Sequence, residues 1–340
     1  MWWRDHAKVL EGHGYILRSR YQPGWQPSWV GTDIQPAFCE DSFRQLHRES
    51  QPKVIDAKRA CDGMSVMIKK CIVTSTEITI ARSLTTPELL RDPMNHCIPI
   101  LDTFQVESEL DLQFIVMPVL RFFFDPPFFA VGEALDFIKQ TLEGIVFLHG
   151  QGVAHRDCSR ANILMDATAM YPRGFHPIGR EAESDGVRVA NPLRRMDASY
   201  VKYYFVDFGI STHFPDPKNP FRVVGGDGQD QEVPDLSAAQ PYDAYPVDVF
   251  ILGNLYKKTF VLAYNNLRPL VEAMTQKEPC ARPNAVDALA QFNAIYQELK
   301  PYTRRWRLEE AGESAISRHI GNIGSAAREI IHQSKHFFGS

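Results

Sequence analysis

Two acidic residues and one amide, spaced along the middle of the chain, constrain the fold more than any other sequence feature. Asp157 lies in the stretch V-A-H-R-D-C-S-R-A-N, which ends at Asn162. A second acid, Asp207, lies in Y-F-V-D-F-G and is followed by Phe208 and Gly209. Carboxylate and amide oxygens are the ligands that Mg²⁺ prefers beside phosphates. We therefore expect the fold to bring Asp157, Asn162 and Asp207 together at a phosphoryl-transfer site.

The composition is that of a folded globular protein. The chain has 340 residues, of which 44% are hydrophobic and 23% charged, enough for one large domain or two ordinary ones. Its net charge of −4 provides no electrostatic basis for nucleic-acid binding. Its 6 cysteines form no C-x-x-C pair, so we expect neither a disulfide framework nor a zinc site, and a cytoplasmic or nuclear protein.

No membrane segment is expected. The first residues, M-W-W-R-D-H, are too polar for a secretory signal. The longest apolar stretch, residues 114–124, is interrupted by Pro118 and Arg121 and cannot span a bilayer.

Residues 1–52 are rich in aromatic residues, proline and glycine. They predict an opening helix to about residue 11, a strand over residues 15–20 and then irregular turns. Their tryptophans are expected to pack against the edge of their own fold, with an exposed binding surface as the alternative.

A β-hairpin is predicted next. Residues 54–57 lead into the turn signal Asp62-Gly63, and the chain returns over residues 65–70. We select Lys69 on the return strand as a candidate phosphate-binding residue. If the register of the hairpin shifts by one residue, Lys70 takes this role instead. The alternative without a functional role is a lysine that only faces solvent.

A short helix is predicted over residues 76–84, with Glu77 in its first turn. The helix dipole alone favours an acid at that place. The functional alternative is a carboxylate that pairs with Lys69 and orients it.

The next segments predict two further strands, which are followed by helices. Strands are expected over residues 97–101 and 112–117, and Pro118 ends the second because it cannot donate a ladder hydrogen bond. Residues 131–148 carry an apolar stripe at helical spacing. A further buried helix is expected from Asp248, whose acid should bind the backbone near Asp157.

Two segments have open interpretations. The polar insertion over residues 166–200 is either functional or disordered. In the tail, isoleucines at positions 316, 320, 323 and 330 suit an amphipathic helix. We expect this helix to pack against its own domain. Binding in the groove of a partner protein is the second alternative, and binding to a membrane surface is the third.

Together these motifs resemble the eukaryotic protein kinase superfamily over residues 53–299. The stretches N-H-C-I-P-I-L-D, A-H-R-D-C-S-R-A-N-I-L-M-D and M-Y-P-R-G-F-H-P are most similar to the divergent kinase-like proteins of mushroom-forming fungi. The resemblance implies an α+β bilobal fold with ATP and Mg²⁺ between the lobes. It divides the chain into an N-terminal extension with the first strand (1–52), a small β-rich N-lobe (53–117), a hinge (118–122), a larger, mainly helical C-lobe (123–299) and a tail (300–340).

The resemblance also implies residue roles. Asp157 would be the catalytic base, and Asn162 and Asp207 would hold Mg²⁺. Lys69 and Glu77 would position the phosphates. The adenine would lie against Met117 and the hinge residue Val119. His155, Arg156, Phe208, Gly209 and Asp248 would have structural or regulatory roles, and so would Asp235 and Arg282, which the resemblance implies form an ion pair.

Several departures from the kinase pattern bear on activity. No G-x-G-x-x-G sequence occurs in residues 13–57, so the phosphates would lack that backbone cover. Ser159 stands where Ser/Thr kinases carry a lysine, and Arg160 is the candidate substitute. Met67 replaces the alanine above the adenine. Ser211 and Thr212 lie only near the start of the activation loop, so switching by loop phosphorylation is not expected.

The primary hypothesis is a kinase that transfers the ATP γ-phosphoryl group to Ser/Thr hydroxyls of a protein substrate. A pseudokinase scaffold is the alternative, motivated by the missing glycine-rich loop and by Met67. A small-molecule kinase of the aminoglycoside or choline type is the remote third, disfavoured by Asp235 and Arg282.

Overall fold

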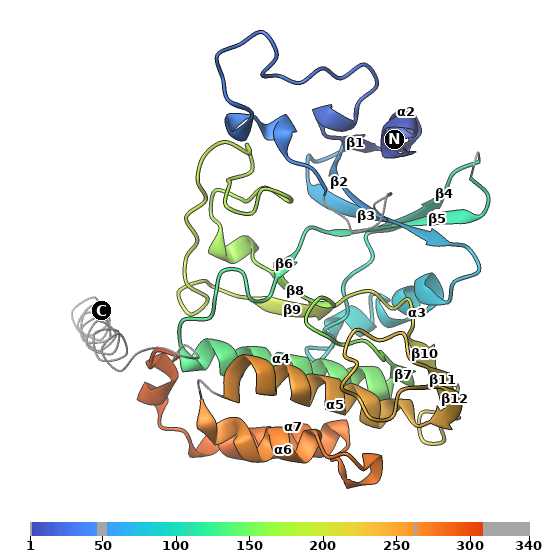
Figure 1. Cartoon of the computed structure of the whole chain (residues 1–340), viewed down its shortest axis with the longest axis vertical. Helices are drawn as coiled ribbons and strands as arrows, with labels where there is room; N and C mark the ends of the chain where they lie inside the picture. Colours follow the sequence, from blue (N-terminus) through green and yellow to red (C-terminus); the bar gives the residue numbers. More distant parts are fainter. Residues whose placement is uncertain (1, 46–52, 108, 262–263, 309–340) are drawn as a thin grey trace.

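The chain folds into an α+β structure with an N-terminal antiparallel sheet and helices mainly in its C-terminal part (Figure 1). In this computed structural model, residues 2–45, 53–107, 109–261 and 264–308 are described. The amphipathic helix expected around residues 316–330 lies outside them.

The N-terminal sheet has five strands in the order β1-β2-β3-β5-β4. They are β1 (Tyr15–Leu17), β2 (Val54–Arg59), β3 (Ser65–Ile72), β4 (Asp102–Gln105) and β5 (Leu112–Pro118). All neighbouring strands are antiparallel. The hairpin predicted from Asp62-Gly63 is β2–β3, where Gly63 takes the positive φ of 71° that glycine tolerates.

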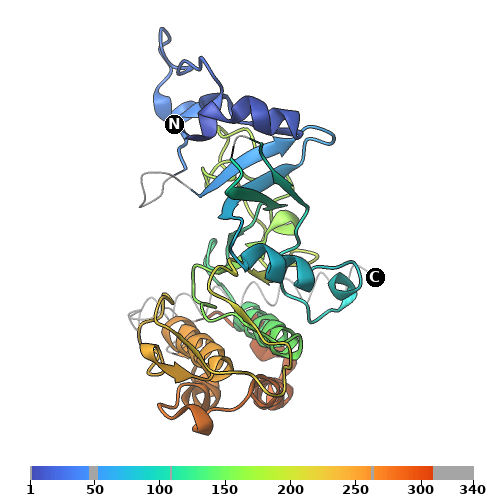
Figure 2. The same ribbon diagram turned by 90° about the vertical axis from the view of Figure 1, so that its right-hand side faces the viewer.

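One face of this sheet is covered by the first residues of the chain. Helices α1 (Trp2–Asp5) and α2 (Ala7–Gly12) place Trp3 and Leu10 in a core with Val66 and Ile68 of β3. Figure 2 shows these helices on the side of the sheet away from the C-terminal part. The prediction that the first tryptophans pack against their own fold is confirmed for Trp3, which is buried.

Side chains on β3 alternate between the two faces of the sheet, as the strand period requires. Val66 and Ile68 face the N-terminal helices, whereas Cys71 packs on the opposite face with Ile78 and Ile115. Ile78 belongs to α3 (Glu77–Leu84), which confirms the predicted short helix. Lys69 shares the face of Cys71 and therefore points toward α3.

The strand predicted over residues 97–101 is wrong. Cys97 forms only an isolated parallel bridge with Phe205, and the next strand, β4, begins at Asp102. Pro99 has no N–H to donate, so this segment cannot form a regular ladder. Instead it crosses from the C-terminal part, where the Ile98 N–H binds Phe205 O at 3.1 Å, to β5.

The C-terminal part is built around two long helices, α4 (Val131–Gly150) and α5 (Ala244–Tyr256). The first confirms the predicted stripe, and the second is buried almost throughout. Their apolar side chains form the main core with α6 (Arg268–Met274) and α7 (Ala285–Glu298). A π-helical turn over Lys257–Val261 extends α5. No helix in the described ranges is both long enough and apolar enough to cross a bilayer.

The other described strands form small sheets. One has the order β6-β8-β9, from Arg121–Phe122, Ile163–Asp166 and Lys202–Phe205. Two-stranded pairs join β7 (Val153–Ala154) to β10 (Thr212–His213) and β11 (Val223–Gly225) to β12 (Ser237–Tyr242). Because β7, β8 and β9 flank the motifs around Asp157 and Asp207, they determine where those acids lie.

The insertion between β8 and β9 rises beside the sheet and meets the β1–β2 connection (Figure 1). That connection contains 3₁₀ turns at Ser19–Tyr21, Pro36–Phe38 and Glu40–Ser42. Buried His176 of the insertion lies 3.1 Å from Glu40 Oε1, and its ring lies 4.9 Å from that of Phe43. Arg18 joins the same network through Glu40 at 3.1 Å. The insertion is therefore packed into the fold.

Candidate active site

Lys69 lies between two carboxylates from different elements. Its ammonium is 2.5 Å from Glu77 Oε1 on α3 and 2.9 Å from Asp207 Oδ1, just after β9. Lys70 points to the opposite face, where its Nζ lies 4.5 Å from the centroid of the Trp2 ring. Of the two candidate lysines, the structure thus places Lys69 beside the acids.

These contacts shift the pKa values of Lys69 and Asp207. Burial alone would lower the pKa of Lys69, but Asp207 and Glu77 outweigh it and raise that pKa above its ordinary value. Desolvation would raise the pKa of Asp207, but the Lys69 ammonium outweighs it and lowers that pKa. Lys69 is therefore charged and Asp207 ionised at neutral pH.

Asp157 and Asn162 are joined to each other and to the residue before Asp207. The Asn162 amide nitrogen donates to Asp157 Oδ2 at 2.8 Å and to Asp157 O at 2.9 Å. The Asn162 carbonyl accepts the Val206 N–H at 3.0 Å. Because the nitrogen donates to Asp157, the side-chain oxygen is the Asn162 atom that could bind a cation. The β8–β9 pairing thus sets Asn162 next to Asp207.

Two left-handed backbone conformations shape the site. Arg156 has φ 66° and Asp207 has φ 64°, the only non-glycine residues in the described ranges with positive φ. Such conformations cost on the order of 1–3 kcal/mol and persist only where the surroundings impose them. His155, fully buried, lies 3.1 Å from Val206 O through Nε2, and its ring packs 5.1 Å from that of Phe208. These contacts hold the two acidic motifs together.

Asp248 anchors the loop over residues 155–162, hereafter the 155–162 loop. Its carboxylate accepts the His155 N–H at 2.8 Å and the Arg156 N–H at 2.6 Å, as expected from the sequence. Its helix, however, begins before Asp248: α5 starts at Ala244, because Asp243 caps it by accepting the Tyr245 N–H at 3.1 Å.

A second buried ion pair fixes the segment after Gly228. Arg282 Nη2 lies 2.6 Å from Asp235 Oδ2, and the two side chains are 0% and 2% exposed. The same guanidinium donates to three backbone carbonyls, so its charge is well compensated. The predicted pairing of Asp235 with Arg282 is therefore present.

Arg156 holds the loop after Gly209 without needing an anion. Its guanidinium donates to Ile210 O at 3.2 Å, to Val224 O at 2.7 Å and to the Tyr242 hydroxyl at 2.9 Å. Thr212 Oγ1 lies 3.3 Å away. Gly209 starts this loop, and its N–H donates to Asp207 Oδ1 at 3.3 Å.

Gln229 is a site residue that the sequence reasoning missed. Its N–H donates to Asp157 Oδ1 at 2.9 Å, and its side-chain amide donates to Asp157 Oδ2 at 3.2 Å. Burial nevertheless raises the pKa of Asp157 above its ordinary value. The only sequence signal is the preceding glycine run. A Cβ added at Gly228 would lie 3.1 Å from Arg156 O, a tight contact that the glycine avoids.

Three other predicted residues lie at the edge of this cluster. Arg160 is exposed, with its guanidinium 3.7 Å from the centroid of the Phe124 ring. Half-buried Met117 stands opposite Met67 in the β3–β5 pairing. Half-buried Val119 lies between β5 and β6.

A long connection over residues 18–53 joins β1 to β2. Arg18 there donates to both oxygens of buried Asp56, at 2.6 and 3.2 Å. Asp56 pairs with Met67 across the β2–β3 hairpin and so lies on the sheet face that carries Lys69. An ion pair, not a glycine turn, occupies this end of the sheet.

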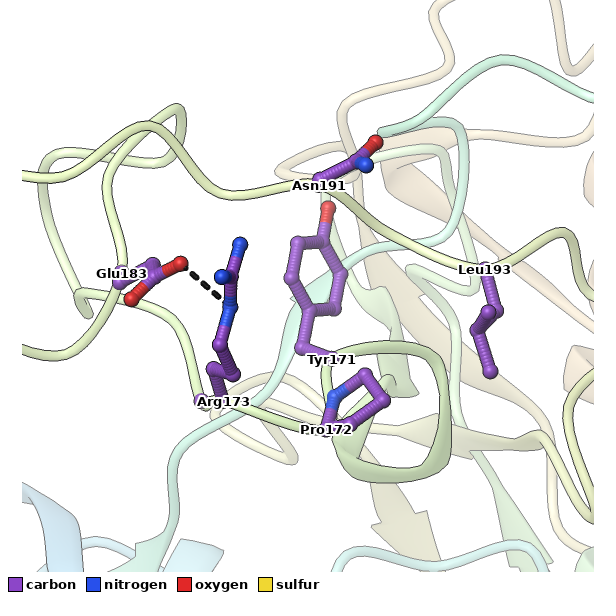
Figure 3. Close-up of a pocket in the computed structure, with 7 residues that line it drawn as sticks. Tyr171, Pro172, Arg173, Glu183, Asn191 and Leu193 are labelled. Carbon is purple, nitrogen blue, oxygen red and sulfur yellow. Dashed lines mark ion pairs between the residues drawn. The ribbon is translucent and has the colours of Figure 1, made fainter.

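The insertion carries a cavity of about 380 Å³ of its own (Figure 3). Tyr171, Pro172 and Asn191 line it, and Arg173 crosses it to reach Glu183 at 2.7 Å. Glu183 is buried and also lies 3.4 Å from Arg188, so two arginines of the insertion already compensate its charge.

The donor set near Asp207 fits a cation only together with phosphates. Within the described ranges, no group of three His, Cys, Asp or Glu side chains could hold a metal alone. Mg²⁺ commonly takes one or two protein ligands and completes its shell with water and phosphate oxygens. Asn162 and Asp207 match that mode.

No protein-family model matches the chain.

Proposed function

We propose that this protein is a kinase with a bilobal fold, which transfers the ATP γ-phosphoryl group to Ser/Thr hydroxyls of a protein substrate. One observation carries the proposal: Lys69 binds Glu77 and Asp207 at 2.5 and 2.9 Å, while Asn162 binds Asp157 at 2.8 Å at the same end of the β8–β9 strand pair. These polar groups come from segments far apart in the chain, and hydrophobic packing alone does not require their meeting.

Each residue has a role that its contacts support. Glu77 orients Lys69 toward the phosphates, and Asp207 and Asn162 supply oxygens to Mg²⁺. When bound, Mg²⁺ neutralises the charge that develops on the transferred group. Asp157 orients the acceptor hydroxyl and takes its proton, and its raised pKa makes the carboxylate a better base. Asp248 holds the 155–162 loop in place for this step.

The test is transfer of a labelled γ-phosphoryl group from Mg-ATP to a mixed protein or peptide substrate. Wild-type protein is compared with Asp157→Asn, and folding of both is checked by circular dichroism. Label that enters serine or threonine only with wild-type protein supports the proposal. Absence of any transfer that depends on Asp157 would refute it.

A second function, a pseudokinase scaffold, is favoured by one specific contact. Gln229 donates to both oxygens of Asp157, at 2.9 and 3.2 Å, where an acceptor hydroxyl would have to approach. The Arg18–Asp56 pair also favours the scaffold function. It lies at the end of the sheet where a glycine-rich loop would cover the phosphates with backbone N–H groups. A thermal-shift series with ATP and Mg²⁺ separates the two, since a ligand at about 100 times its Kd stabilises by roughly 2.7 kcal/mol. Absence of a Mg²⁺-dependent shift favours the scaffold.

A further inference from the structure

Two arginines and two phenylalanines form a continuous stack beside the 155–162 loop. Phe122 and Phe124 lie parallel, with ring centroids 5.2 Å apart and planes 9° apart. Arg180 of the insertion lies 4.2 Å from the Phe122 ring centroid, and Arg160 lies 3.7 Å from that of Phe124. Phe122 ends β6 and Phe124 lies in the turn that follows, while Phe123 between them enters the core.

Arg160 stands out within this stack because no acid compensates its charge. In the described ranges its guanidinium makes no hydrogen bond and no ion pair, and its contact is the face of Phe124. The acid in the same segment, Asp125, is already taken by Arg121 at 3.0 Å and Arg180 at 3.7 Å. Arg160 is therefore a positive charge without an acidic partner among the described side chains, although the whole chain carries a net charge of −4.

A stacked guanidinium is well suited to binding an oxyanion. The ring covers one face of the planar group and limits its rotamers, while the N–H edges stay free. Those edges match a carboxylate or phosphate in a bidentate geometry. Arg160 also follows Asp157 by three residues in the same loop, so such an anion would lie near the acceptor hydroxyl.

We propose that Arg160, held on Phe124, is a specificity-determining residue that binds an acidic side chain of the protein substrate next to the acceptor hydroxyl. This inference rests on the proposed function and deepens it by naming the substrate class. The shared chemistry is an oxyanion, supplied either by aspartate or glutamate or by a residue that is already phosphorylated.

The test uses peptides with a single acceptor serine, in which each flanking position carries alanine, glutamate, phosphoserine or lysine in turn. Wild-type protein should show a kcat/KM about tenfold higher for an acidic residue at one or more positions, the equivalent of one charge-assisted hydrogen bond. Arg160→Glu should abolish or reverse that preference, and Arg160→Lys should keep part of it. The charge-matched control is Arg194→Glu, since Arg194 stacks on Phe129 at 3.8 Å but lies in the insertion. This control should keep the wild-type preference.

A binding measurement separates this inference from the proposed function. Fluorescent peptides with the acceptor serine replaced by alanine are titrated by anisotropy, without ATP. Tighter binding of acidic peptides that is lost in Arg160→Glu supports the subsite even if no phosphoryl transfer occurs. Transfer with equal use of acidic and neutral peptides overturns the subsite and leaves the kinase proposal standing. An equal loss of activity on every peptide in Arg160→Glu also overturns it, and a preference for glutamate or for phosphoserine identifies the source of the anion.

Discussion

The ammonium of Lys69 lies 2.9 Å from Asp207 Oδ1, although the two residues are 138 positions apart in the chain. Lys69 comes from the third strand of the N-terminal sheet and Asp207 from the turn after β9. The pair therefore ties the sheet to the C-terminal part, at the place where we propose that a nucleotide's phosphates bind.

Lys69→Met should weaken Mg-ATP binding and reduce phosphoryl transfer by at least about a hundredfold, because the lysine is proposed to neutralise the phosphates. Lys70→Met is the matched control, since Lys70 differs by one position and faces Trp2 on the other side of the sheet. Isothermal titration with ATP and Mg²⁺ measures both variants. Equal losses in the two would contradict the assignment of Lys69.

Asp248→Ala should lower the free energy of unfolding by roughly 3–5 kcal/mol. The fully buried carboxylate accepts two backbone N–H groups and lies 3.0 Å from His149 Nε2, and each partner left without an acceptor costs about 1–3 kcal/mol. Urea unfolding measures the change. Exposed Asp33→Ala serves as the control and should stay within about 0.5 kcal/mol of wild type. A similar, small change in both variants would show that Asp248 does not anchor the 155–162 loop.

The contribution of Asp207 to stability should depend on pH with a definite sign. Its pKa is lowered in the folded state, so the ionised group stabilises the fold above the ordinary aspartate pKa of about 3.9. That contribution is lost as the pH falls through the lower, folded pKa. The difference in unfolding free energy between wild type and Asp207→Asn should therefore be constant near neutrality and shrink below about pH 4. Asparagine also tolerates positive φ, so the backbone preference is kept. A difference that grows on acidification would refute the ion pair.

Gly179→Ala should loosen the contact between the insertion and the β1–β2 connection. An added Cβ would lie 2.5 Å from the Phe43 ring, which must shift, at a cost of about 1–3 kcal/mol. Gly12→Ala is the matched control, because nothing lies within 4 Å of its added Cβ. Hydrogen exchange of residues 18–45 should speed up in Gly179→Ala only. Unchanged exchange would mean that this contact does not hold the connection.

Local sequence patterns predicted many of the elements. The turn at Asp62-Gly63, the apolar stripe of α4 and the proline at the end of β5 each act through nearest neighbours, so their signals lie within a few residues. The segment over residues 97–101 misled the prediction because its apolar residues pack across two sheets without forming a strand. Whether these residues form a strand depends on where their backbone lies in the fold, and the apolar pattern of the sequence does not reveal that position.

The tertiary partners of the site were only partly accessible from sequence. Asp235 and Arg282 could be paired in advance because each stands in a recognisable motif. Gln229 and the Arg160–Phe124 stack could not, because a lone glutamine or phenylalanine has no pattern that reveals what it meets. The ordered insertion was equally hidden: its anchor, His176 beside Glu40, joins residues 136 positions apart.

The most direct measurement compares Mg-ATP binding and phosphoryl transfer in wild type and Asp157→Asn. If Asp157 is the base of a site whose phosphates are held by Lys69, Asn162 and Asp207, the variant should bind Mg-ATP about as tightly as wild type. Its transfer to serine or threonine should fall by roughly 10²–10⁴-fold, the usual contribution of general-base catalysis. Wild-type protein that neither binds Mg-ATP nor transfers its γ-phosphoryl group, or a variant that transfers it equally well, would contradict the account.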